Sequence, residues 1–209
     1  MRALILAGSA ITVTDTLREL CQSAEWVIAA DSGVRHAAVL GVWPDLIVGD
    51  FDSATAGDLA AYQEVSRETY PARKDALDLE LALQSAKARG ATHFILVGAL
   101  GGRLDQTLAA LFIAAKLCAQ APVLLHSGHS AAYPLRTGDT LTLTLPAGKI
   151  FSVLSLSPHS RLSLAGSSYP LDDADLPFGV GLGVSNETTA LPLSVTLHSG
   201  SALLLIDLS

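Results

Sequence analysis

Cysteine is scarce in this sequence of 209 residues, where only Cys21 and Cys118 occur. Two cysteines in separate helix-like stretches provide no disulfide framework, and they favour a reducing compartment. Basic residues are also few, 13 against 20 acidic ones, which gives a formal net charge of −7 and a pI near 5.2. This balance argues against general nucleic-acid binding and against a polybasic membrane anchor, and it favours a small-molecule or protein partner.

Long uninterrupted apolar runs are missing as well. The most membrane-like stretch, residues 107–125, is broken by Lys116, Gln120 and Pro122, so we interpret it as a helix followed by a strand. The N-terminal segment has a short apolar run behind Arg2 and no small-residue cleavage pattern, which predicts a first strand instead of a signal peptide. Half of the residues are hydrophobic, which excludes intrinsic disorder. We therefore expect a cytoplasmic protein with no membrane partner.

Several motifs of well-known enzyme classes are absent. The sequence has no G-x-x-x-x-G-K-[ST] phosphate loop, no G-x-G-x-x-G, no H-E-x-x-H and no G-x-S-x-G. These absences argue against P-loop, dinucleotide-binding, zinc-protease and serine-hydrolase chemistry. Asp50-Phe51-Asp52 invites comparison with aspartyl-nucleophile phosphatases, but Ala54 stands where their motif has threonine or valine, and the preceding strand is not the first.

The pattern of the sequence changes near residues 121–127, which divides the chain into two parts. Before this boundary, short aliphatic runs alternate with helical patterns, which predicts a parallel sheet covered by helices on both faces. The predicted strands are 2–7, 26–30, 46–48, 64–70, 94–97 and 123–126, and the predicted helices are 14–23, 33–40, 54–62, 75–89 and 105–119. After the boundary, strict alternation at 141–145, 151–157 and 191–197 predicts half-buried antiparallel strands. We therefore predict an α/β domain over 1–125 and a smaller all-β domain over 126–209.

Aspartates follow four of the predicted parallel strands. They are Asp31, Asp50 with Asp52, Asp75 with Asp78, and Asp105 after the glycines 98, 101 and 102. Singly, each has a plain explanation: Asp75 and Asp78 favour a helix N-terminus, Asp31 fits a turn, and Arg103 with Asp105 fits an exposed charge pair. Because the carboxyl ends of parallel strands meet at one edge of a sheet, we expect these carboxylates to lie together.

The joint arrangement predicts a nucleotide phosphate-transfer site. Carboxylates without a histidine or cysteine cluster favour Mg²⁺, which binds through one or two carboxylates and substrate phosphates. Arg73, Lys74 and Arg103 stand beside the acids and are suited to meet phosphate oxygens. The glycines let the backbone approach a phosphate closely, and the following helix offers its N-terminus.

The order of these elements resembles the thiamine pyrophosphokinase family along nearly the whole chain. The resemblance rests on Ala-Asp-Ser-Gly at 30–33, Gly-Asp-Phe-Asp-Ser at 49–53, Lys-Asp-Ala-Leu-Asp at 74–78, Gly-Gly-Arg-Leu-Asp at 101–105 and Ser-Asn at 185–186. It implies a Rossmann-like, ATP-binding catalytic domain followed by an antiparallel β-sandwich that binds thiamine and forms a homodimer, with the active site near the subunit interface. It also implies transfer of a pyrophosphoryl group from ATP to the hydroxyl of thiamine, which releases AMP.

The resemblance assigns roles to individual residues. Asp50, Asp52 and Asp78 would hold Mg²⁺ and, with Arg103 and Asp105, form the catalytic set. Asp105 would orient the acceptor hydroxyl or take its proton. The residues assigned to ATP are Asp31, Lys74, Asp75, Gly101, Gly102 and Arg103. Ser185 and Asn186 would lie near the vitamin, although a β-turn also explains this pair.

Departures from the family pattern leave alternatives open. The family usually has glycine at Ser32, Asn-Arg near Arg35-His36 and threonine at Leu77, and it often has histidine at Gln106. A related family pyrophosphorylates a hydroxymethyl pterin, which is the alternative acceptor. A catalytically silent thiamine- or nucleotide-binding regulator and a bare phosphatase are the other hypotheses. Tyr169 and Phe178 are candidates for stacking on the vitamin rings.

Overall fold

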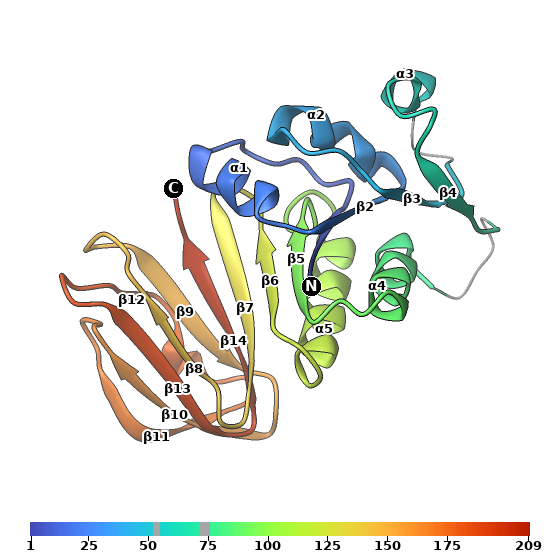
Figure 1. Ribbon diagram of the computed structural model, residues 1–209. Coiled ribbons are helices and arrows are strands. Elements are labelled where there is room, and N and C mark those ends of the chain that lie inside the picture. The colour runs from blue at the N-terminus through green and yellow to red at the C-terminus, as the bar shows by residue number, and fades with distance from the viewer. Residues whose placement is uncertain (52–54, 72–75) are drawn as a thin grey trace. The chain divides into compact units, whose positions relative to one another are not determined.

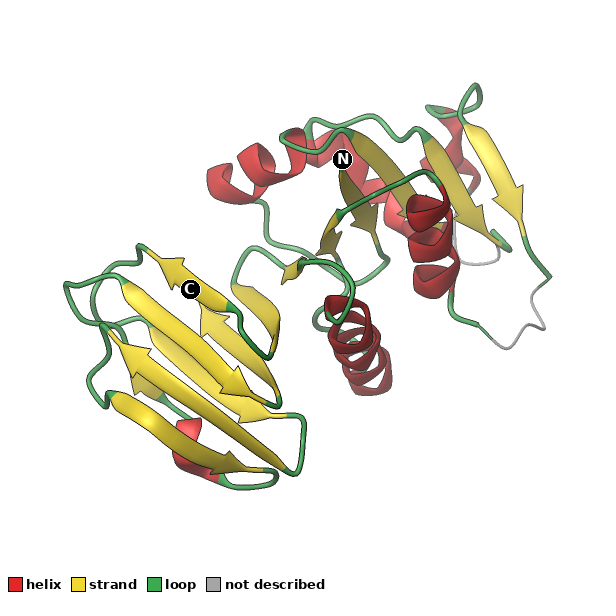
Figure 2. Ribbon diagram, turned by 60° about the horizontal axis from the view of Figure 1, so that its bottom comes forward, coloured by secondary structure: helices red, strands yellow, loops and turns green. Residues whose placement is uncertain are grey.

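The computed structural model describes residues 1–51, 55–71 and 76–209. The chain divides into two compact units, one of Met1–Ile113 with Ala121–His129 and one of Ala114–Gln120 with Ser130–Ser209. The first holds a parallel sheet with helices, and the second is built from antiparallel strands (Figures 1 and 2). The fold is therefore mixed α/β, with a large, mostly parallel sheet and a separate antiparallel one.

The strands of the first unit pair in parallel, in the order β6-β5-β1-β2-β3-β4. They are β1 (Arg2–Leu6), β2 (Trp26–Ala30), β3 (Leu46–Gly49), β4 (Ser66–Thr69), β5 (His93–Val97) and β6 (Val123–His126). The chain runs outward from β1 to β4 and then returns to β5 on the other side of β1. The strand order thus reverses between β1 and β5, where open α/β sheets bind their ligands.

Helices lie on both faces of this sheet, as the alternating pattern predicts. They are α1 (Asp15–Gln22), the 3-10 helix η1 (Asp31–Arg35), α2 (His36–Leu40), α3 (Ala56–Ala60), α4 (Asp78–Ala88) and α5 (Leu104–Cys118), whose last residues belong to the second unit. Figure 1 shows α1 and α2 over one face of the sheet and α4 over the other. Leu17 and Cys21 of α1 are fully buried against Leu4 and Leu6 of β1, which explains why this short helix is amphipathic.

The second unit contains two layers of antiparallel strands with one core between them. One layer has the order β12-β9-β14-β7, which is the antiparallel part of the large sheet, and the other is the separate sheet β11-β10-β13-β8. Their bounds are β7 Ser130–Arg136, β8 Thr140–Leu143, β9 Ile150–Ser155, β10 His159–Ala165, β11 Leu171–Pro177, β12 Asn186–Glu187, β13 Leu193–Ser199 and β14 Ser201–Asp207, with the 3-10 helix η2 at Gly181–Gly183. Phe151 and Val153 of β9 share this core with Leu162 and Leu164 of β10.

The structure corrects three details of the predicted elements. The predicted helix 33–40 is a 3-10 helix that continues into α2, and the predicted helix from residue 75 begins at Asp78 with Leu77 as its N-cap. Asp78 therefore occupies the first helical position. Several strands of the second unit are missing from the prediction, β14 among them. Ala202, Leu203 and Leu204 of β14 are buried in succession, so its apolar run does not show the alternation of a half-buried strand.

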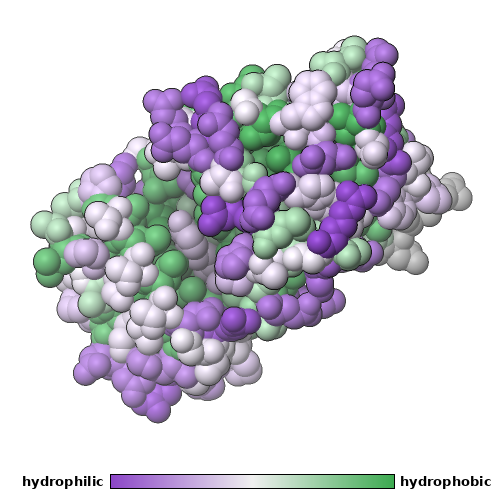
Figure 3. Space-filling view, in the orientation of Figure 1, coloured by the Kyte–Doolittle hydropathy of each residue, from purple (hydrophilic) through white to green (hydrophobic). Residues whose placement is uncertain are grey.

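The surface carries hydrophobic residues as well as polar ones. On the face in Figure 3, both kinds reach the solvent over each unit. Trp43, Phe112 and Phe178 are among the large exposed hydrophobic residues. No helix within the described ranges combines the length and the apolar character that a membrane crossing requires.

Candidate active site

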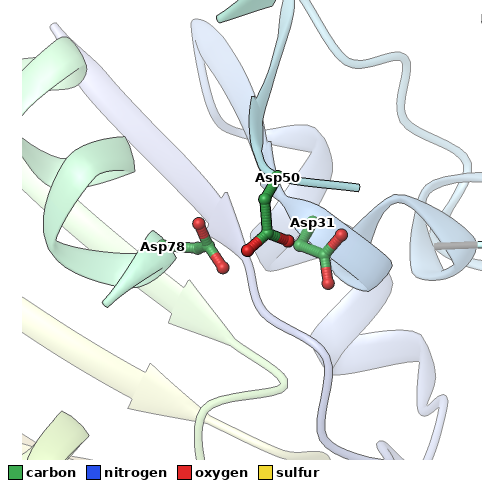
Figure 4. A group of neighbouring side chains, drawn as sticks. All are labelled: Asp31, Asp50 and Asp78. Atoms are coloured by element: carbon green, nitrogen blue, oxygen red, sulfur yellow. The ribbon is translucent and has the colours of Figure 1, made fainter. Parts of the chain in front are cut away.

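Three aspartates from three different segments meet at the carboxyl end of the parallel sheet, beyond β2 and β3. Asp31 begins η1 directly after β2, Asp50 follows β3, and Asp78 is the first residue of α4. One carboxylate oxygen from each lies within 4.8 Å of the others. Figure 4 shows the carboxylates of Asp50 and Asp31 side by side, with Asp78 pointing toward them from its helix. The strand ends therefore bring these carboxylates together, as the sequence analysis predicts for this edge.

The local backbone brings these carboxylates close. Asp31 has a φ of 46°, a left-handed conformation that is uncommon for residues other than glycine. A Cβ atom on Gly49 would lie 3.0 Å from the Cβ of Asp31, so the absence of a side chain there lets the ends of β2 and β3 approach. Asp31 is only 7% exposed, whereas Asp50 and Asp78 are half-buried.

The donor set fits a hard divalent cation. Carboxylates this close repel one another unless a positive charge lies nearby, and oxygen ligands without histidine or thiolate are what Mg²⁺ and Ca²⁺ bind. Asp31 is predicted from the sequence as a nucleotide ligand and not as a metal ligand, but the structure groups its carboxylate with those of Asp50 and Asp78. The sequence feature that points to Asp31 as a site residue is its position directly after a buried strand, which Asp50 shares.

A cleft of about 660 Å³ opens beside the three aspartates. Its lining comes from the ends of β1, β2 and β3, the start of α4 and the segment from β5 into α5. The lining residues are 7–10, 30–32, 50, 76–79, 98, 99, 102, 103, 106 and 110. The turn at 7–10 was not singled out in the sequence, although Gly8-Ser9 directly after a strand is a turn signal.

The glycine segment after β5 lies on the cleft through Gly98 and Gly102. Gly98 has a φ of +73°, and a Cβ atom there would lie 2.2 Å from the carbonyl oxygen of Ala7. The Thr107 hydroxyl accepts a hydrogen bond of 3.1 Å from the N–H of Gly101, and the Ser9 hydroxyl donates to the Gly101 carbonyl at 3.0 Å. These contacts set the backbone of this segment against the turn after β1.

Arg103 and Asp105 form a bidentate pair at the start of α5. The guanidinium Nε and Nη2 donate to the two carboxylate oxygens at 3.1 and 2.6 Å, and both side chains are well exposed. The hydrogen bond from Arg103 lowers the pKa of Asp105, and the same pair raises the pKa of Arg103. Among the described residues, Arg103 and Gln106 line the cleft from this segment, whereas Asp105 does not. A carboxylate with a lowered pKa is a weak proton acceptor.

Four of the residues predicted for the site lie outside the described residues, namely Asp52, Arg73, Lys74 and Asp75. Leu77 lies in the cleft lining, so the aliphatic side chain that replaces the family's threonine reaches the site. The backbone N–H of Leu77 donates to a carboxylate oxygen of Glu80 at 3.1 Å, which stabilises the start of α4.

Ser185 and Asn186 lie in the second unit. The N–H of Ser185 donates to the Ser152 hydroxyl at 3.1 Å. Asn186 is 5% exposed, and its amide pairs with Tyr169, accepting from the backbone N–H at 3.1 Å and donating to the carbonyl at 2.8 Å. Tyr169 itself is 70% exposed. Asn186 therefore holds the backbone that presents this ring.

Comparison with known families identifies the chain. Residues 17–125, more than half of the sequence, match the profile of "Thiamin pyrophosphokinase, catalytic domain", and residues 140–202 match that of "Thiamin pyrophosphokinase, vitamin B1 binding domain". The chain belongs to the thiamin pyrophosphokinase family. As a member it is an enzyme, a transferase that forms thiamine diphosphate with ATP and a divalent metal.

Individual relatives of the thiamin pyrophosphokinase family agree. Thiamin pyrophosphokinase 1 of Caenorhabditis elegans is 24% identical over 95% of this chain and 85% of its own length. Thiamine pyrophosphokinase of Bacillus subtilis is 27% identical over 77% of each chain. The crystal structure of thiamine pyrophosphokinase from Bacillus subtilis has a TM-score of 0.86 at 21% identity over the whole of both chains. The structure of the Candida albicans enzyme has a TM-score of 0.79 at 16% identity, over 100% of this chain and 90% of that one.

Proposed function

We propose that this enzyme transfers a pyrophosphoryl group from Mg²⁺-bound ATP to the hydroxyl of thiamine, giving thiamine diphosphate and AMP. The observation that carries the proposal is the meeting of three carboxylates within 4.8 Å of one another on a cleft of about 660 Å³. Their oxygens would hold the cation, which supplies positive charge to the triphosphate. Asp31 joins Asp50 and Asp78 in this role, and Asp52 stays a predicted fourth carboxylate.

The reaction is a displacement at the β-phosphorus of ATP. The hydroxyl oxygen of thiamine bonds to this phosphorus while the bond to the oxygen bridging the α-phosphate breaks. The electron pair of that bond leaves with AMP, and the proton of the hydroxyl passes to solvent water. Such a transfer needs positioning and charge stabilisation more than covalent catalysis. In our proposal Arg103 binds phosphate oxygens from the rim, and Asp105 holds its guanidinium in place.

Further parts of the proposal concern the rest of the chain. Lys74, Asp75, Gly101 and Gly102 would contact ATP, in the nucleotide domain of 1–125 that we describe as Rossmann-like. Ser185 would contact the vitamin, and Asn186 would act through Tyr169, in the all-β domain of 126–209. We also propose a cytoplasmic homodimer with the vitamin near the subunit interface, which rests on the family resemblance.

Product analysis tests the reaction. With ATP, thiamine and Mg²⁺ we expect AMP and thiamine diphosphate in equal amounts, measured by chromatography of the quenched mixture. The appearance of ADP would contradict pyrophosphoryl transfer, and consumption of a hydroxymethyl pterin in place of thiamine would favour the alternative acceptor. Substituting Mn²⁺ or Ca²⁺ for Mg²⁺ tests the choice of metal. Asp78→Asn should reduce turnover by about 100-fold or more without unfolding the protein, because a charged metal ligand is lost.

A further inference from the structure

The turn at Gly8 and Ser9 is held from behind by the segment that follows β2. The turn lines the cleft, together with its neighbours Ala7 and Ala10. On its other side, the Arg35 guanidinium donates to the Gly8 carbonyl. Nε2 of His36, the first residue of α2, lies 2.9 Å from the Ser9 carbonyl oxygen. Two consecutive carbonyls of the turn are thus bound by two consecutive side chains.

A third contact joins the same two segments. A Cβ atom on Gly8 would lie 2.4 Å from the hydroxyl oxygen of Ser32, so the absence of a side chain at Gly8 leaves room for this serine rotamer. Ser32, Arg35 and His36 are three of the positions at which the sequence departs from the family pattern. All three contact the Gly8–Ser9 turn. The departures therefore gather at this turn, with Ser32 in the cleft lining and Arg35 and His36 outside it.

The hydrogen bond to Ser9 defines the state of His36. A carbonyl oxygen only accepts, so Nε2 of the ring must carry a hydrogen. His36 is 7% exposed, and its burial lowers its pKa, which keeps the ring in the neutral form with that single hydrogen on Nε2. Arg35 and Asp58 are the charged groups that act on the ring, in opposite directions.

The two carbonyl contacts orient the peptide planes of the turn. All peptide bonds in the described residues are trans, so each N–H points away from the carbonyl of its own peptide. The N–H of Ser9, opposite the Gly8 carbonyl, donates to the Gly98 carbonyl at 2.8 Å. The N–H of Ala10, opposite the Ser9 carbonyl, points away from His36, and Ala10 lines the cleft.

We propose that Arg35 and His36 are positioning residues that hold the Gly8–Ser9 turn, and with it the Ala10 amide, in the geometry that receives the triphosphate of ATP. This inference rests on the proposed function. Neither residue is among the described residues that line the cleft. They therefore act on the nucleotide through the backbone, and a change at either residue should alter ATP binding more than the chemical step.

A matched pair of variants at His36 tests this role. Leucine in His36→Leu fills a similar volume without a donor, whereas the amide of glutamine in His36→Gln can donate from the position of Nε2. We expect His36→Leu to raise the KM for ATP and the Kd for Mg²⁺-ATP about five- to tenfold, which matches the loss of one buried hydrogen bond. The kcat and the KM for thiamine should change less than about twofold, and His36→Gln should restore ATP binding.

Arg35 provides a second pair of variants that does not depend on a buried site, because Arg35 is exposed. Arg35→Met should also raise the KM for ATP, and Arg35→Lys should bring this KM part of the way back to that of the unaltered enzyme. Unchanged ATP binding in a folded His36→Leu protein would overturn the inference, as would failure of His36→Gln to restore it. If His36→Leu does not fold, an unchanged KM in Arg35→Met overturns it. Failure of the unaltered enzyme to bind Mg²⁺-ATP would instead contradict the proposed function.

Discussion

His126 illustrates how one buried side chain links the stability of the fold to pH. It ends β6 with 5% exposure, and its Nδ1 accepts a hydrogen bond of 2.9 Å from the N–H of Gly128. Burial lowers its pKa below the ordinary value of 6.5. A buried imidazole that accepts at Nδ1 favours the neutral form, so protonation competes with folding.

We expect the protein to lose stability as the pH falls below 6.5, because the unfolded chain then binds a proton that folded His126 resists. One such group contributes a slope of at most about 1.4 kcal/mol per pH unit. His126→Asn keeps an acceptor near the position of Nδ1 but does not titrate, so its urea unfolding free energy should depend less on pH between 7.5 and 5.5. The exposed neighbour His129, changed to Asn, is the control and should leave the slope unaltered. Equal slopes in all three proteins would contradict this account.

At the scale of elements, the junction of β1 and β5 positions the cleft. The two strands pair in parallel with Leu6 opposite Val97, and the chain leaves both at the switch point. Gly98 comes directly after β5 and lies against the Ala7 carbonyl, where a Cβ atom would approach to 2.2 Å. Backbone at this distance cannot move aside without separating the strand ends.

Two glycine substitutions separate this packing effect from backbone conformation. Gly98 and Gly90 both have a positive φ, +73° and +85°, but a Cβ atom on Gly90 would meet nothing within 4 Å. Gly90→Ala should cost about 1–2 kcal/mol of unfolding free energy, from the left-handed conformation alone. Gly98→Ala should cost at least about twice as much and should also weaken ATP binding. Urea titrations of the two variants check this, and equal losses would show that the contact with Ala7 is unimportant.

The sequence predicts best those helices and strands in which buried residues form a continuous run or recur at a regular interval. The parallel strands other than β4 are short, mostly aliphatic runs between helical patterns, which is why the sequence predicts them in place, whereas β4 is the polar segment Ser66–Thr69. β11 carries Asp172, Asp173 and Asp175, residues that disfavour strands, yet Arg161 and His159 of the neighbouring β10 pair with two of them. Such cross-strand compensation depends on which strands become neighbours, and no local pattern records it.

At the scale of the whole molecule, the candidate site follows from topology more than from any single motif. The position of aspartates directly after several parallel strands predicts that they meet, because parallel strands end at one edge of the sheet. The same positions do not distinguish Asp31, which joins the carboxylate group, from Asp105, which pairs with Arg103. That difference depends on the turn geometry after each strand. The roles of Arg35, His36 and Asn186 were equally hidden, because each contacts backbone distant in sequence.

The protein has a formal net charge of −7, and three of its carboxylates lie together at this edge of the sheet. An anionic substrate must approach them there. We therefore expect ATP without a divalent cation to bind poorly and Mg²⁺-ATP to bind well. Asp50→Asn should reverse part of this preference: it should bind metal-free ATP about three- to tenfold more tightly, because one repulsive charge nearby is removed. It should bind Mg²⁺-ATP more weakly.

Glu19→Gln distinguishes local from overall charge. Glu19 is an exposed residue of α1 outside the cleft lining, and its change makes the net charge of −7 less negative by one, as Asp50→Asn does. Exposed charges beyond about 8 Å are screened at physiological ionic strength, so Glu19→Gln should leave both affinities within about twofold of the unaltered protein. Calorimetric titration of the unaltered protein and both variants with ATP, in EDTA and in excess Mg²⁺, measures the six affinities. Similar gains in metal-free binding for both variants would mean that the overall field of the protein, and not the three carboxylates, sets the requirement for the cation.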